Sequence, residues 1–64
     1  MNTLKAILEA DKIADRYRRG DLTSDEAQAG LLDLGWFDVE IFGISVKASY
    51  DGGIRLDLGT GELP

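Results

Sequence analysis

The spacing of apolar side chains changes once along this chain, at Gly35. Before Gly35, apolar residues recur every three or four positions, which is the period of an amphipathic helix. After it, they alternate with polar residues, which is the period of a half-buried strand. A chain of 64 residues forms one domain, and helices followed by strands can bury their apolar sides only against each other. The sequence therefore predicts an α+β fold spanning residues 1–64, a two-helix hairpin packed on a small two- to three-stranded antiparallel sheet.

Two helices are expected, at about residues 3–19 and 23–34. The apolar side of the first is formed by residues at three- and four-residue spacing: Leu4, Ile7, Leu8, Ile13, Ala14 and Tyr17, with Ala10 filling the gap. Gly20 closes this helix, because glycine adopts the left-handed conformation of a helix C-terminus without strain. The second helix begins at the capping box Thr23-Ser24-Asp25-Glu26, whose first and last side chains accept from each other's backbone N–H. Gly35 closes the second helix.

Strands are expected at about residues 37–50 and 53–58, with residues 59–64 as a tail. The apolar positions change from odd-numbered to even-numbered at Phe42-Gly43. Either a β-bulge in one long strand or a tight turn produces such a change. The bulge is favoured, because a two-residue turn placed on Phe42 and Gly43 would require a positive φ at Phe42.

A long first strand would pair with the second strand only along its later half. Its earlier half, near residues 37–42, would then form an unpaired edge, which is where a strand from a second copy of the chain can add. A homodimer joined through sheet edges is therefore one assembly that the sequence allows.

Charge is distributed unevenly along the chain. The formal net charge is −5 at pH 7. Between Asp21 and Val46 there is no Lys or Arg but there are six carboxylates: Asp21, Asp25, Glu26, Asp33, Asp38 and Glu40. Such a surface repels nucleic acid and anionic membranes and attracts basic proteins. The expected partner is a basic protein surface, with no direct contact to nucleic acid or membrane.

An exposed aromatic side chain beside carboxylates would be a suitable binding site for an arginine-rich partner. Trp36 and Phe42 are the candidates, and a small core also has a use for Trp36. The predicted partner-binding residues are Asp25, Glu26, Asp33, Trp36, Asp38, Glu40 and Phe42. For the carboxylates the alternative is an ordinary solvated surface, in which Asp25 and Glu26 complement a helix dipole.

The residue inventory points away from catalysis and metal binding. The chain has no His and no Cys, which removes the commonest general base, the thiolate nucleophile and the commonest neutral metal ligand. A domain of this size also has little interior in which the pKa of a carboxyl group could be raised. The sequence predicts no enzymatic activity, no catalytic residues, no cofactor and no metal.

The first ten residues include Lys5 and Glu9, so they lack the apolar run of a signal peptide or a membrane span. The protein is therefore expected in the cytoplasm. Its expected function is that of a non-enzymatic, small acidic protein-interaction module that binds a basic surface of a partner protein. The most specific form is an inhibitor of a nucleic-acid-binding complex, a viral protein of the phage anti-CRISPR or anti-restriction type. The alternative is a structural or assembly subunit that homo-oligomerises through sheet edges.

Overall fold

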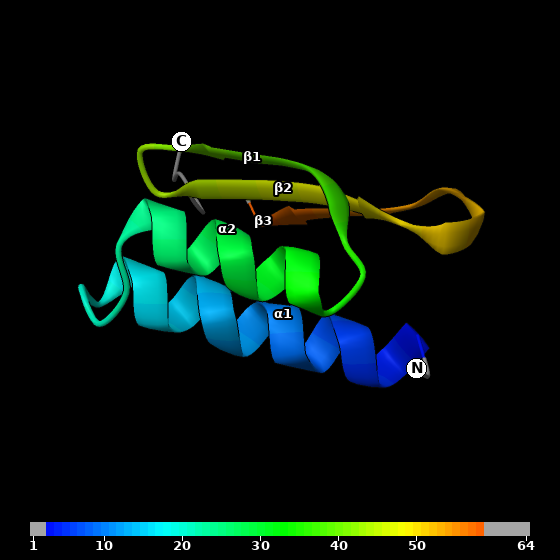
Figure 1. The fold of residues 1–64 in the computed structure, drawn as a ribbon, viewed down its shortest axis with the longest axis horizontal. Helices are drawn as coiled ribbons and strands as arrows, with labels where there is room; N and C mark the ends of the chain where they lie inside the picture. The colour runs from blue at the N-terminus through cyan, green and yellow to red at the C-terminus, as the bar shows by residue number, and fades with distance from the viewer. Residues whose placement is uncertain (1–2, 59–64) are drawn as a thin grey trace, which may run out of the picture.

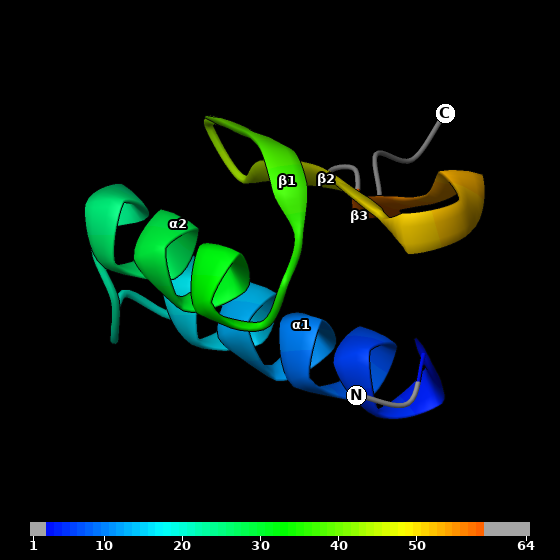
Figure 2. The same cartoon turned by 45° about the vertical axis from the view of Figure 1, so that its right-hand side comes forward.

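The computed structural model describes residues 3–58, which form two helices followed by three strands (Figure 1). The elements are α1 (Thr3–Arg18), α2 (Ser24–Asp33), β1 (Phe37–Phe42), β2 (Ser45–Tyr50), the short 3-10 turn η1 (Asp51–Gly53) and β3 (Ile54–Leu58). The sheet is antiparallel with strand order β1-β2-β3, and both helices lie on the same face of it (Figures 1 and 2). The predicted α+β fold, a helical hairpin on a small antiparallel sheet, is confirmed. The predicted tail, residues 59–64, lies outside the described residues.

The ends of both helices follow the sequence signals. At the start of α2, the Thr23 hydroxyl accepts from the Glu26 N–H at 3.1 Å, and the Glu26 carboxylate accepts from the Thr23 N–H at 2.9 Å. Such a cap is worth about 1 kcal/mol, because it satisfies donors that a helix start leaves unpaired. Gly20 and Gly35 follow the two helices with φ of 86° and 100°.

Each helix closes with the same pair of hydrogen bonds, known as a Schellman motif. After α2, the Gly35 N–H donates to the Leu32 carbonyl and the Trp36 N–H donates to the Leu31 carbonyl, at 3.0 and 3.1 Å. The chain therefore leaves α2 by a fixed path, and the residue that follows this path is Trp36.

Trp36 is the largest side chain of the core and is only 1% exposed. Around it the core is made mostly of small residues: Ala6, Ala10 and Ala14 of α1, Leu31 of α2, and Val46 and Ala48 of β2. The alanines of α1 recur every fourth residue and so form one smooth stripe along the helix. The predicted apolar side of this helix needs correction, because Leu4 and Leu8 lie outside the core and are 63% and 53% exposed.

The predicted single strand over residues 37–50 and its favoured bulge at Phe42-Gly43 are wrong, because the structure has two strands joined by a tight turn. The loop residues are Gly43 and Ile44, one position later than the turn considered from the sequence. Gly43 has a φ of 59°, whereas Ile44 is not among the residues with positive φ. A positive φ at the first loop residue alone is the pattern of a type II′ turn.

The pairing of β1 with β2 explains the change from odd to even apolar positions. In a hairpin with a two-residue loop, facing residues have numbers of opposite parity, as in Ile41 with Val46. Both of these side chains face the helices. A hairpin therefore produces the observed change without any bulge at the turn.

A bulge does occur in β1, but nearer its start. Two residues of β1, Asp38 and Val39, lie opposite the single residue Ala48 of β2. Asp38 has a φ of 51°, a conformation that aspartate tolerates better than most residues. The extra residue places Phe37 on the sheet face that points away from the helices, where it is 48% exposed.

Replacing Gly43 tests the assigned turn. Gly43→Val is expected to lower the free energy of unfolding by about 1–2 kcal/mol, because a Cβ is disfavoured at positive φ. An added Cβ would meet no atom within 4 Å, so the effect would come from the backbone conformation alone. Urea unfolding followed by far-UV circular dichroism measures it. Ile44→Val is the matched control, with an expected change of less than about 0.5 kcal/mol. Equal midpoints for both variants would contradict the turn.

Candidate functional site

Five of the six carboxylates between Asp21 and Val46 lie on two elements that are neighbours in the fold, whereas Asp21 lies before α2, 3.8 Å from Arg19. Helix α2 packs against β1. Together these elements carry five exposed carboxylates and no Lys or Arg: Asp25, Glu26, Asp33, Asp38 and Glu40. All seven basic residues of the chain lie outside α2 and β1. We refer to the surface formed by α2 and β1 as the acidic side.

The five carboxylates fall into two groups along this side. Helix α2 and strand β1 run in opposite directions, so α2 begins near the β1–β2 turn and ends near the start of β1 (Figure 1). Asp25 and Glu26 lie in the first turn of α2, and the Glu26 carboxylate already serves as a helix cap. Asp33 ends α2, and Asp38 lies in the bulge at the start of β1. The structure thus places acidic groups at both ends of one side.

Glu40 differs from the other acidic residues. In the register of the sheet it lies opposite Lys47 of β2, and Lys47 in turn lies opposite Asp57 of β3. A base flanked by two carboxylates across neighbouring strands offsets part of their charge. The sequence did not reveal this neighbour, because Lys47 becomes adjacent to Glu40 only when the chain folds back at the β1–β2 turn.

Phe42 is the most exposed large apolar side chain of the described residues, at 87%. It lies at the end of β1, next to a turn that is attached to α1 at two points. The Tyr17 hydroxyl donates to the Gly43 carbonyl, and the Arg18 Nε donates to the Ile44 carbonyl at 3.1 Å. An exposed aromatic ring on a firmly held support has the features of an interface anchor.

Trp36, the other aromatic candidate, lies in the core. Its ring centroid is 4.9 Å from that of Tyr50, with the two rings tilted by 45°. Its indole N–H is buried and makes no hydrogen bond within residues 3–58. Of the two roles considered for Trp36, the structure shows core packing, and a ring with 1% exposure is not available to a partner.

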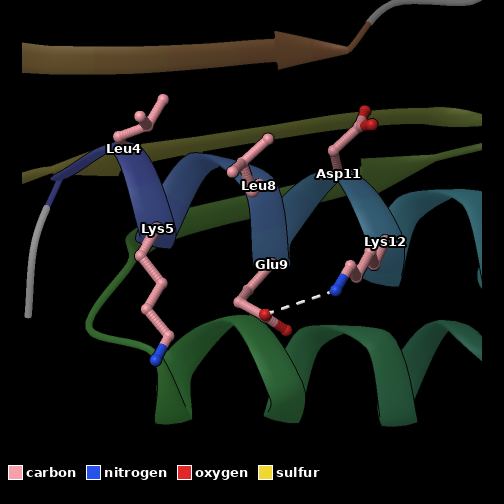
Figure 3. A pocket seen from close by; sticks show the side chains of 6 residues that line it. All are labelled: Leu4, Lys5, Leu8, Glu9, Asp11 and Lys12. Carbon is pink, nitrogen blue, oxygen red and sulfur yellow. Dashed lines mark ion pairs between the residues drawn. The ribbon is translucent and has the colours of Figure 1, made fainter.

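A surface depression of about 340 Å³ lies along the first half of α1 (Figure 3). Its lining residues are Leu4, Lys5, Leu8, Glu9, Asp11 and Lys12. Figure 3 shows Leu4 and Leu8 on the side of α1 that faces β3. Glu9 and Lys12 form an ion pair of 3.5 Å. The lining therefore joins two exposed leucines to solvated charges.

Within residues 3–58, no three acidic side chains lie close enough together to hold a metal ion. Neither of the two helices in that range combines the length and the apolar character needed to cross a bilayer. Comparisons with protein-family models, with curated proteins and with solved structures find no match to this chain.

The two aromatic candidates are expected to respond differently to truncation. Trp36→Ala should lower the free energy of unfolding by about 3–5 kcal/mol, which is most of what so small a domain possesses. Phe42→Ala should change it by less than about 0.5 kcal/mol, because the ring is already exposed to water. Thermal unfolding followed by far-UV circular dichroism compares the two variants. A loss of stability in Phe42→Ala as large as that in Trp36→Ala would contradict these assignments.

Proposed function

We propose that this protein is a non-enzymatic interaction module whose acidic side binds a basic surface of another protein. The observation that supports this proposal is the adjacency of α2 and β1, which together hold five exposed carboxylates and no base. Charges of one sign on neighbouring elements add to a field that extends over the whole side. Such a field speeds the approach of a basic partner and disfavours acidic ones.

Charge steers association more than it holds a complex together, so the proposal also needs an apolar contact. Phe42 supplies it, since its ring is 87% exposed and stands at the end of β1. Asp25 lies in the first turn of α2, which begins at the same end of the molecule (Figure 1). Asp33 and Asp38 form the second contact region at the other end. Glu26 and Glu40 contribute less, because one caps α2 and the other lies opposite Lys47.

The more specific form of the proposal is an inhibitor that occupies the nucleic-acid-binding site of its partner. Carboxylates on a helix and a strand hold fixed positions, so they can stand in for the phosphates of a nucleic acid at a basic site. Phage proteins of the anti-CRISPR and anti-restriction type offer an analogy in charge and size. The proposal includes a viral origin and a cytoplasmic location, where nucleic-acid-binding complexes act.

The alternative function is an assembly subunit joined through sheet edges. The edge of the sheet formed by β1 does not support this function. That edge contains the bulge at Asp38 and a second acidic residue, Glu40. Bulges and charges at an edge hinder the addition of another strand. Two copies of β1 side by side would also bring like charges together. The opposite edge of the sheet, formed by β3, is the one that favours assembly.

Neutralising the acidic side is expected to weaken partner binding. The triple variant Asp33→Asn, Asp38→Asn, Glu40→Gln should reduce affinity for a basic partner by about tenfold or more, because it removes both charges of the second contact region and the smaller contribution of Glu40. Partners are first captured from an extract of the expressing cells on immobilised wild-type protein. Affinities are then measured with the purified partner at low and at high salt, where binding should weaken as salt rises.

The matched control removes the same charge elsewhere. Asp11, Asp15 and Asp51 lie on α1 and η1, and their triple replacement by Asn should leave the affinity close to that of the wild type. A partner that bound both triple variants and the wild type equally well would contradict the proposal. Equal losses in the two triple variants would mean that only net charge matters, which also contradicts it.

A further inference from the structure

Strand β3 forms the second edge of the sheet and differs from β1 in every feature that limits pairing. Among residues 3–58 it pairs with β2 alone, and its register runs without a bulge from Ile54, opposite Tyr50, to Leu58, opposite Val46. Its charges are one base and one acid, Arg55 and Asp57. A regular edge strand with alternating apolar residues is a template on which another strand can pair.

We propose that the partner at this edge is a second copy of the chain, with β3 of one copy antiparallel to β3 of the other about a two-fold axis at Leu56. The strand reads Ile54-Arg55-Leu56-Asp57-Leu58. When it is aligned antiparallel to a second copy, residues of opposite charge face each other and apolar residues face apolar residues. In the proposed register Arg55 of each copy lies opposite Asp57 of the other. Leu56 lies opposite Leu56, and Ile54 lies opposite Leu58.

The charges select this register. Within one copy, Asp57 lies opposite Lys47, but Arg55 lies opposite the uncharged Ser49. Pairing about Leu56 gives Arg55 an acidic neighbour in each copy. A shift of one residue would turn the apolar side chains to the solvent face, and parallel pairing in register would set Arg55 against Arg55.

The sheet faces are also compatible with this arrangement. Ile54, Leu56 and Leu58 lie opposite helix-facing residues of β2, and each is partly buried. Residues that face each other across antiparallel strands point to the same side of the sheet. The two copies would therefore form one six-stranded sheet with all four helices on a single face.

Helix α1 supplies additional apolar contact. Leu4 and Leu8 are 63% and 53% exposed and lie on the side of α1 toward β3 (Figure 3). A strand added to β3 would run about 4.8 Å beyond it, so its helix-facing residues would extend over this side of α1. Stable dimers usually bury at least ~1,200 Å² in total. Two five-residue strands supply only part of such an area, and the leucines extend it.

The proposed dimer is independent of the proposed function. It uses β3 and α1, whereas the acidic side is formed by α2 and β1 at the other edge of the sheet (Figure 2). Both copies would keep their acidic sides exposed. Failure of one proposal therefore leaves the other standing.

Charge reversal on β3 tests the dimer through the mass of the purified protein. Light scattering of the wild type over a wide range of concentrations should give twice the 7.0 kDa mass of the chain. Arg55→Glu sets carboxylates opposite each other at both ends of the paired strands, and Asp57→Lys does the same with bases. For each variant alone, the dissociation constant of the dimer should be about tenfold higher than that of the wild type, or more.

Mixing the two variants tests most directly whether the charges of β3 pair between copies. Each copy of Arg55→Glu complements a copy of Asp57→Lys at both positions, so an equimolar mixture should regain the dimer mass. Asp51→Lys introduces the same charge change outside the strand and should keep the wild-type dimer. Leu8→Gln, which does not alter β3, should weaken the dimer. A wild type that is monomeric at every concentration, or a mixture that associates no better than its components, would overturn the proposal.

Discussion

The fold depends on the burial of Trp36 between α1, α2 and the sheet. The Schellman motif that closes α2 fixes the backbone path that leads from the helix to Trp36. The Trp36 ring then packs against Tyr50 and the small residues of α1 and β2. A domain of this length has a small interior, so few large side chains fit at its centre. The alanine stripe of α1 makes room for that ring. The remaining elements are arranged around this contact.

An alanine-lined core has consequences at the surface. Large apolar residues that the core does not accommodate, such as Leu4, Leu8, Phe37 and Phe42, remain exposed. These four lie in two places, with the leucines on α1 toward β3 and the phenylalanines on β1, while Leu32 of α2 and Ile44 of the β1–β2 turn are exposed elsewhere. Each place also has its own charge pattern, mixed at β3 and acidic at α2 and β1. We therefore propose different partners for the two edges of this small sheet, a second copy at β3 and a basic protein at β1.

The sequence was sufficient wherever structure is set by a few neighbouring residues. The capping box at Thr23, the glycine ends of both helices and the order of helices before strands are local, and they were predicted correctly. The predicted bulge at Phe42-Gly43 is wrong because a two-residue hairpin loop produces the same change of apolar parity, and the sequence pattern alone does not separate the two. The exposure of Leu4 and Leu8 was missed because helical spacing alone does not reveal which apolar side a small core uses. Lys47 and Glu40 lie opposite each other on neighbouring strands. A pattern within a few residues of sequence does not predict such a pair.

We propose that a basic partner binds the side formed by α2 and β1. The most direct measurement is a nuclear magnetic resonance titration of the isotope-labelled protein with an arginine-rich peptide. Amide shifts should concentrate in α2 and β1, including Phe42 and Asp38, and should diminish as salt rises. Shifts spread evenly over the molecule, or concentrated on α1 and β3, would contradict it.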